Sequence, residues 1–267
     1  MKVAPKKHLG QHFLINQSVC KKIVDAVPTL APKSLVLEIG PGKGAITQFL
    51  LERNDIDLHA FEIDMESIKY LNLTFPHFTQ VHLTDFLKAD LRQFFEDQPF
   101  SVVGNFPYNI SSQIMFKCLE NRAKIPLILG MFQKEVAKRI AEPPGSKEYG
   151  ILSVLIQAFY DVKYLFSVEP GSFFPPPKVI SGVIRCTRNN RLTLPCDEAL
   201  FIIVVKTAFN QRRKTLRNSL KSLTLSLPSE FSSKRPEQLT VEDYIYLTQF
   251  IEEDGKKQHG SISINSK

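Results

Sequence analysis

Short apolar runs alternate with amphipathic segments over residues 34–184 of the chain. The run Ser34–Ile39 (SLVLEI) predicts a buried strand, and residues 45–53 (AITQFLLER) carry apolar side chains at helical spacing, which predicts a helix. The same reasoning predicts strands at 58–62, 80–83, 101–104 and 125–131, and helices near 65–73, at Ser111–Glu120 and at Lys134–Ala141. Apolar strands that alternate with helices predict a parallel sheet covered on both faces, as in an α/β protein.

The pattern changes after residue 150. Residues 151–164 and 179–186 have the pattern of two late strands or a strand pair, separated by the proline-rich turn at 175–177. The remaining sequence predicts a linker followed by helices, at 189–195, Glu198–Asn210 and 241–252.

Two domains are therefore expected. We assign residues 1–188 to a mostly parallel α/β domain and residues 189–255 to a small helical domain. Residues 256–267 are polar and contain Gly and Ser, which predicts a disordered tail.

Composition limits the classes of function. The chain has 267 residues, with 43% apolar and 23% charged, which is ordinary for a globular protein with a real core. A net charge of +7 favours polyanionic partners, although charge alone is weak evidence. The four cysteines form no C-x-x-C pair, so we expect neither a metal site nor a disulfide framework. No signal peptide or membrane span is predicted, and we expect a cytoplasmic location.

The first chemical signal is a glycine-rich turn between a predicted strand and a predicted helix. It reads Glu38-Ile-Gly40-Pro-Gly42-Lys-Gly44. Glycines allow a tight turn and a close approach of the backbone to a ligand, and the next helix offers free N–H groups. In dinucleotide-binding folds such a loop holds pyrophosphate. The G-x-G-x-G spacing and the preceding acid instead favour a ligand that has an ammonium group and no phosphate.

Acidic residues also follow the next two predicted strands. Glu62 closes the strand at 58–62, a place where an acidic side chain commonly accepts both ribose hydroxyls. Asp85 follows the strand at 80–83 and suits the exocyclic amine of an adenine. Taken singly, Glu62, Asp64 and Asp85 can equally be solvated carboxylates at strand ends. Together, three acids at three successive strand ends match an adenosine-shaped ligand better than a chance arrangement would.

The strand at 101–104 leads into a possible catalytic loop, which begins at Asn105. Such a loop suits the transfer of a methyl group to an amine such as adenine N6. That nitrogen is a poor nucleophile because its lone pair is delocalised into the ring, so the transfer depends mainly on positioning. The side-chain carbonyl of Asn105 and the backbone carbonyl of Phe106 can accept the amine's hydrogens. Pro107 stiffens the loop, and Tyr108 can stack on the base. The alternative is an ordinary turn with Tyr108 in the core.

A run of basic residues without acids lies between residues 199 and 229. A solvated helix face normally mixes charges of both signs, so the missing acids favour contact with RNA phosphates. The run contains Lys206, Arg212, Arg213, Lys214, Arg217 and Lys221, of which all but Lys206 are our candidate RNA contacts.

These residues, in this order, resemble the ribosomal RNA adenine-N6,N6-dimethyltransferase family, whose bacterial members confer kasugamycin sensitivity. The similarity covers nearly the whole chain and includes the strings KKHLGQHFL at 6–14, FFPPPKV at 173–179 and FNQRRKTLRNSL at 209–220. The resemblance implies a Rossmann-like methyltransferase domain, a helical RNA-binding domain and S-adenosyl-L-methionine as cofactor.

The resemblance also implies roles for individual residues. His12 and Leu14 are expected to contact the cofactor, and Phe173 to face the target base opposite Tyr108, although the adjacent Phe174 leaves that register open. The candidate cofactor contacts are then His12, Leu14, Gly40, Gly42, Glu62, Asp85 and Asn105. The candidate catalytic residues are Asn105, Phe106, Pro107, Tyr108 and Phe173.

In family terms, the substrate is a pair of adjacent adenines in the loop of the 3′-terminal hairpin of 16S RNA. Both would be dimethylated at N6, within the 30S particle or its precursor, by a monomeric enzyme. Two alternatives remain open at this point. One is an adenine-N6 methyltransferase of large-subunit RNA, of the macrolide-resistance type, and the other is a non-catalytic ribosome assembly factor on the same fold. A Rossmann dehydrogenase is a distant third, because the glycine spacing does not suit it.

Overall fold

The computed structural model describes residues 3–29, 31–224 and 226–262 and divides the chain into two compact units. The first unit combines Met1–Lys138 with Asp161–Arg188, and the second combines Arg139–Tyr160 with Asn189–Lys267. The segment Arg139–Tyr160 thus joins the second unit, whereas the sequence analysis placed it in the α/β domain. Its helix α7 (Ile151–Gln157) packs on helices of that unit, α8 (Glu198–Asn210) and α11 (Val241–Ile262).

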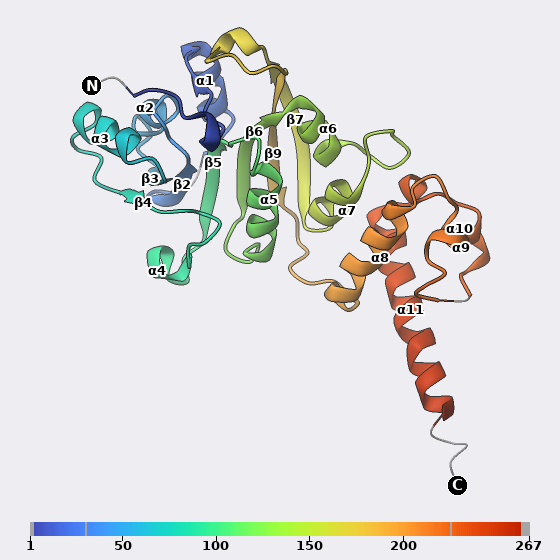
Figure 1. Cartoon of the computed structure of the whole chain (residues 1–267). Helices are drawn as coiled ribbons and strands as arrows, with labels where there is room; N and C mark the ends of the chain where they lie inside the picture. Colours follow the sequence, from blue (N-terminus) through green and yellow to red (C-terminus); the bar gives the residue numbers. More distant parts are fainter. Residues whose placement is uncertain (1–2, 30, 225, 263–267) are drawn as a thin grey trace. The chain divides into compact units, whose positions relative to one another are not determined.

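A seven-stranded sheet forms the centre of the first unit (Figure 1). Its strand order is β4-β3-β2-β5-β6-β9-β7. The first five of these pair in parallel and β9 pairs antiparallel to β6, which confirms the predicted mostly parallel α/β fold. The strands are β2 (Ser34–Ile39), β3 (Ile56–Glu62), β4 (Val81–Leu83), β5 (Phe100–Asn105), β6 (Leu127–Gln133), β7 (Tyr160–Val168) and β9 (Ser181–Arg188).

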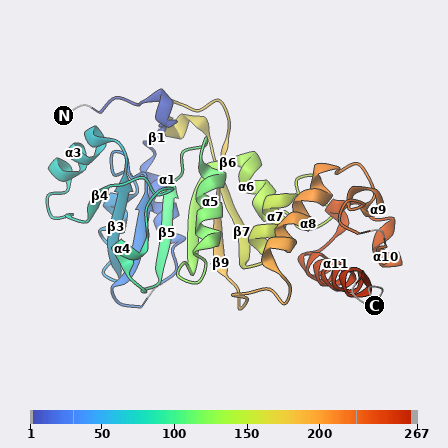
Figure 2. The ribbon, with the colours of Figure 1, turned by 60° about the horizontal axis from the view of Figure 1, so that its bottom comes forward.

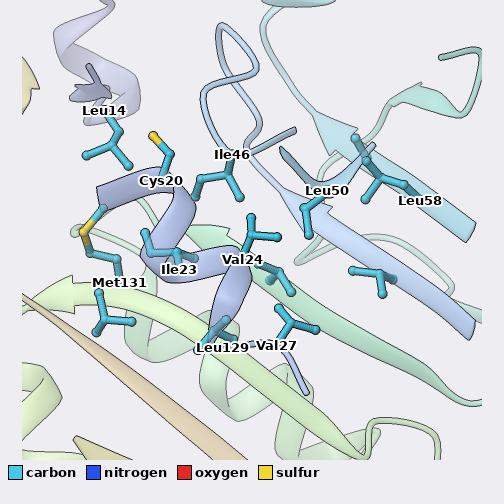
Figure 3. Close-up of a cluster of buried hydrophobic side chains, with 14 of the residues drawn as sticks. Leu14, Cys20, Ile23, Val24, Val27, Ile46, Leu50, Leu58, Leu129 and Met131 are labelled. Atoms are coloured by element: carbon cyan, nitrogen blue, oxygen red, sulfur yellow. The ribbon is translucent and has the colours of Figure 1, made fainter. Parts of the chain in front are cut away.

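Helices cover both faces of the sheet because alternate residues of its central strands are apolar on each side. On one face, α1 (Gln17–Asp25) and α2 (Thr47–Leu50) form a buried hydrophobic cluster with Leu58 of β3 and Leu129 of β6 (Figure 3). On the other face, α5 (Ser111–Glu120) lies beside β5 and β6 in both ribbon views (Figures 1 and 2). The remaining helices of this unit are α3 (Met65–Thr74), α4 (Arg92–Phe95) and the first part of α6 (Lys134–Ala141).

The antiparallel direction of β9 places its first residue beside the carboxyl ends of the parallel strands. The carboxyl ends of β2, β3, β5 and β6 share one edge of the sheet, and β9 begins at that edge because it runs the other way. Its first residue, Ser181, pairs with Gln133 at the end of β6. At the same edge, two short strands, β1 (Phe13–Leu14) and β8 (Phe173–Phe174), pair antiparallel and join segments distant in sequence.

Most predicted elements are present, with two differences. Residues 151–164 do not form strands alone, because Ile151–Gln157 is the helix α7 and only the residues from Tyr160 onward form β7. An apolar run with several β-branched residues fits either structure locally, and here the Ser153 hydroxyl accepts from the Gly150 N–H, a bond that supports a helix start. The helix expected at 45–53 is shortened to α2, since turns precede and follow it.

The described part of the second unit is helical, as expected. The Asp197 side chain accepts from the Leu200 N–H and starts α8. Between α8 and α11 lie the short helices α9 (Leu216–Ser219) and α10 (Ser229–Ser232) and the 3-10 helix η3 (Pro236–Gln238). α11 continues to Ile262, past the expected end at residue 252 and into the segment expected to be a disordered tail; residues 263–267 lie outside the described residues. Within the described ranges, no helix is long and apolar enough to cross a membrane.

The ring of Phe106 occupies a slot formed by two glycines that pair across β5 and β6. Gly104 is opposite Gly130, and a Cβ at Gly104 would lie 2.7 Å from the Ile39 carbonyl oxygen and 2.9 Å from the Phe106 ring. A Cβ at Gly130 would overlap the same ring. Phe106 is almost fully buried, so the slot anchors the loop that follows β5.

We therefore expect Gly130→Ala to destabilise the fold by about 1–3 kcal/mol, the usual cost of overpacking a core. Thermal or denaturant unfolding measures this loss. Gly171→Ala is the matched control, because a Cβ there meets nothing within 4 Å. Equal stability of the two variants would contradict the assignment of this slot.

Candidate active site

A pocket opens at the carboxyl edge of the sheet and encloses about 1000 Å³ of space, including solvent at its mouth. This volume is sufficient for a nucleoside-sized ligand. Its lining contains every predicted cofactor contact and the predicted loop residues: His12, Leu14, Gly40, Gly42, Glu62, Asp85, Asn105, Phe106, Pro107 and Tyr108. The structure thus brings together residues from five separate parts of the sequence.

The glycine-rich turn after β2 requires its glycines. Gly40, Gly42 and Gly44 have φ angles of 65°, 56° and 78°, in the left-handed region that favours glycine. A Cβ at Gly42 would also lie 3.0 Å from the ring of Phe13, whereas one at Gly40 would meet nothing within 4 Å. The turn therefore brings its backbone close to the pocket and packs against the N-terminal segment.

Glu62 at the end of β3 is buried and accepts three backbone hydrogen bonds. The N–H of Gly42 donates to Oε2 at 3.0 Å, and those of Ile63 and Asp64 donate to Oε1 at 2.8 and 2.9 Å. Burial raises the pKa of Glu62, and these hydrogen bonds oppose the rise. A carboxylate has about four acceptor positions, so one is left for a ligand hydroxyl.

Glu38, the last residue but one of β2, also lines the pocket. It is only 2% exposed and accepts a 2.6 Å hydrogen bond from the Thr47 hydroxyl. Burial raises its pKa from 4.5 to about 7, while the Thr47 bond lowers it and the nearby Glu62 carboxylate raises it further. Glu38 was not among the cofactor contacts predicted from the sequence, although its position directly before the glycines is a signal for such a role.

Asp85 lies at the other side of the pocket, after β4. Its Oδ1 accepts from the Leu87 N–H at 3.0 Å, and Lys88 lies 3.8 Å away. The side chain remains partly exposed, and the 3.8 Å from its Oδ2 to the Lys88 Nζ is longer than a hydrogen bond. Asp85 is thus placed to accept from a ligand at the pocket rim.

The N-terminal segment crosses the pocket and is tied to it from both sides. The Lys6 ammonium lies 2.6 Å from the buried Asp64, and Gln11 donates to the same carboxylate at 3.2 Å. Burial would raise the pKa of Asp64, but the bonds from Lys6 and Gln11 outweigh it and lower the pKa. On the opposite side, the Asn105 amide donates to the His12 carbonyl oxygen at 2.9 Å. The sequence did not predict that Lys6 pairs with Asp64, since nothing local marks them as partners.

Tyr108 is held at its face and at its hydroxyl. The His12 ring stacks on it with 5.7 Å between centroids and 25° between planes, and Ser181 lies 2.6 Å from its hydroxyl. His12 in turn has Nδ1 2.8 Å from the Pro175 carbonyl oxygen. Burial raises the pKa of Tyr108, so the phenol stays neutral.

The structure does not place Phe173 in the pocket lining. Phe173 is 2% exposed and belongs to the hydrophobic cluster beneath β1, whereas Phe174 is 59% exposed. Pairing of β8 with β1 determines this, because adjacent residues of a strand point to opposite faces. The string FFPPPKV alone does not show which of the two phenylalanines faces the core.

The basic run lies in the second unit, and its members differ in their contacts. Arg213, Lys214, Arg217 and Lys221 are exposed. Arg212 instead donates to the Ser146 carbonyl oxygen at 3.2 Å and lies 3.7 Å from the Glu237 carboxylate. Arg212 therefore already stabilises this unit, whatever else it contacts.

No group of three or more potential metal ligands occurs in the described ranges of the chain. A nucleoside-sized pocket at the topological switch of a mostly parallel sheet, with a glycine turn and acids at its strand ends, defines a Rossmann-like methyltransferase that uses S-adenosylmethionine as methyl donor.

Comparison with known proteins agrees with this class and narrows it. The family model described as ribosomal RNA adenine dimethylase matches residues 3–249. The chain belongs to this family. It is 55% identical to the ribosomal RNA small subunit methyltransferase A of Flavobacterium johnsoniae, over 95% of this chain and 98% of the relative. It is 54% identical to the protein of the same name from Parabacteroides distasonis, over 97% and 98%.

Solved structures show the same fold. A dimethyladenosine transferase from Plasmodium falciparum superposes with a TM-score of 0.77 at 24% identity, covering 91% of this chain and 98% of that one. The 23S rRNA methyltransferase ErmE gives a TM-score of 0.66 at 25% identity, with coverage of 89% and 99%. The chain is an enzyme, and the prediction of its fold is confirmed.

The raised pKa of Glu38 predicts a pH-dependent stability. Between pH 4.5 and about 7, the folded chain keeps this proton while the unfolded chain loses it. The contribution is therefore complete below pH 4.5 and is lost as the pH rises through about 7, a change of roughly 3 kcal/mol at most. Glu38→Gln should remove this decline, as measured by denaturant unfolding across the same range. Glu52→Gln, at an exposed site, should keep it; an unchanged decline in Glu38→Gln would contradict the assignment.

Proposed function

We propose that this enzyme dimethylates N6 of two adjacent adenines in the loop of the 3′-terminal hairpin of 16S ribosomal RNA. The observation that carries the proposal is the position of the Asn105 loop, which opens into the same pocket as the Gly40 turn. A methyl donor and an amine acceptor can thus meet at one edge of the sheet. The names of the relatives, at more than half identity over nearly the whole chain, support small-subunit RNA as the substrate.

The pocket residues fit S-adenosylmethionine by their chemistry. Glu62 has an acceptor position left for a ribose hydroxyl, and Asp85 suits an adenine amine at the rim. Glu38 is a buried acid beside the glycine turn, and an ammonium group nearby would favour its ionised form. His12, Leu14, Gly40 and Gly42 complete the walls. When bound, the cofactor supplies a methyl group on a positively charged sulfur.

The Asn105 loop holds the amine that receives the methyl group. Because the Asn105 amide nitrogen donates to the His12 carbonyl, its side-chain oxygen is the atom available to accept from adenine N6. The backbone carbonyl of Phe106 follows it, and the buried Phe106 ring fixes that carbonyl in place. Pro107 restricts the loop further. Two acceptors favour a more tetrahedral nitrogen and so expose its lone pair.

Tyr108 provides a stacking surface for the target base. Its ring lines the pocket, and a loop adenine can leave its own stack at low cost because the RNA there is single-stranded. The exposed Phe174 lies next to the same rim through the pairing of β8 with β1. For Phe173, its burial means that a direct contact with the base requires a change of side-chain position.

Asn105→Ala should abolish methyl transfer, since it removes an acceptor for the amine, while cofactor affinity falls only modestly. Transfer is measured by mass spectrometry of 16S RNA, and cofactor affinity by calorimetry. Asn109→Ala is the matched control, because Asn109 is exposed in the same loop and outside the pocket lining. Undiminished dimethylation by Asn105→Ala would remove this residue from the mechanism.

RNA phosphates are the proposed partners of the basic run. Arg213, Lys214, Arg217 and Lys221 are free to approach a backbone, since each is exposed. Arg212 must also maintain its contacts with Ser146 and Glu237. We propose the helical part of the second unit as the RNA-binding domain.

Arg213→Gln combined with Lys214→Gln should weaken RNA binding and lower the slope of log K against log salt by about 0.7 for each phosphate that is no longer neutralised. The matched control is Lys21→Gln with Lys22→Gln, which removes the same charge from α1. A fall of equal size in the control would assign the salt dependence to net charge and not to this run. Arg212→Gln should in addition lower thermal stability.

The last part of the proposal concerns the ribosomal particle on which the enzyme acts. We propose that a monomer acts in the cytoplasm on the 30S subunit or its precursor. Methylation of isolated 30S particles but not of protein-free 23S RNA is the expected result. The reverse preference would favour the large-subunit alternative.

A further inference from the structure

The hydroxyls of Ser181 and Tyr108 lie 2.6 Å apart, although 73 residues separate them in sequence. Ser181 is completely buried, and Tyr108 is half-buried in the pocket wall. A fully buried hydroxyl needs a hydrogen-bond partner, and the Tyr108 phenol is that partner for Ser181. The contact therefore attaches the Tyr108 phenol to a strand of the central sheet.

The topology explains why these residues meet. Ser181 begins β9 opposite Gln133, and the Lys134 N–H donates to the Ile180 carbonyl oxygen at 2.9 Å just beyond that pair. Asn105 ends β5 opposite Met131 of the same strand β6. The start of β9 and the loop after β5 thus flank the end of β6.

The backbone beneath Tyr108 is already fixed. The Phe106 N–H donates to the Met131 carbonyl oxygen at 3.2 Å, and the Ser111 hydroxyl donates to the Tyr108 carbonyl oxygen at 3.2 Å. The side-chain torsions χ1 and χ2 are the remaining freedom of the ring.

Two contacts remove that freedom, one for each torsion. The phenol oxygen lies on the axis about which χ2 turns, so the bond to Ser181 fixes the direction of the axis but not the plane of the ring. The His12 ring, stacked at 5.7 Å and 25°, fixes the plane. We propose that Ser181 is a positioning residue for methyl transfer, because it aims the Tyr108 ring on which the target adenine stacks.

This inference rests on the proposed stacking role of Tyr108. A tilted ring would carry the base and its amine away from the Asn105 acceptors, and such misplacement lowers the rate of transfer more than binding. The second transfer is the more sensitive, because the monomethylated amine has one hydrogen left to align. Loss of Ser181 should therefore lower kcat and increase the fraction of monomethyladenine.

The experiment compares Ser181→Ala, Tyr108→Phe and the double variant in steady-state methylation of 30S particles, with mass spectrometry of the products. Ser181→Ala should reduce kcat about threefold to tenfold, as expected for one neutral hydrogen bond, with the KM for RNA and cofactor affinity unchanged. Tyr108→Phe should reduce it similarly, and the double variant should be no worse than either. Ser101→Ala, a buried serine of β5, is the control and should retain wild-type kcat and melting temperature.

The outcomes separate this inference from the proposed function. Wild-type kcat and product ratio in Ser181→Ala, or additive losses in the double variant, would overturn the positioning role. A fall in melting temperature without a change in the monomethyl fraction would show that Ser181 is structural only, which also overturns it. Full dimethylation by Tyr108→Ala would instead refute the stacking role of Tyr108 within the proposed function.

Discussion

The buried carboxylate of Glu62 is the interaction on which the site depends. It joins the end of β3 to the glycine turn after β2 through the Gly42 N–H, and it turns the chain into α3 through the N–H groups of Ile63 and Asp64. A carboxylate in this place is costly to desolvate, and the three donors offset that cost. The same carboxylate lines the pocket, so a ribose bound there as proposed would depend on the atoms that shape the turn.

Around Glu62, the N-terminal segment and the loops after the strands complete the pocket wall. The N-terminal segment is held at one end by Lys6 on Asp64 and at the other by Asn105 on the His12 carbonyl. The second of these bonds joins the N-terminal side of the pocket to the loop after β5. A change in the position of the N-terminal segment must therefore displace both sides of the pocket, since His12 also stacks on one face of Tyr108.

Much of this could be predicted from the sequence, because strand and helix periods and strand-end acids are local signals. β2, α5 and the first helix of the second unit after the linker were predicted with their observed bounds. The helix α1 was missed, although Asn16 caps it and Cys20, Ile23 and Val24 form its buried stripe. α7 was mistaken for a strand because an apolar run has no period. The partners Asp64 and Ser181, and the buried side of Phe173, depend on pairings between distant segments, and no local pattern records those.

The pairing of β1 with β8 has a consequence for the order of events during synthesis. Phe13 and Leu14 are made well before their strand partners Phe173 and Phe174, and His12 likewise contacts the distant Pro175 carbonyl. Contacts so distant along the chain form slowly, because a long loop must close before they stabilise anything. A nascent chain that stops short of residue 175 can build most of the sheet, but it cannot close the wall of its own catalytic pocket.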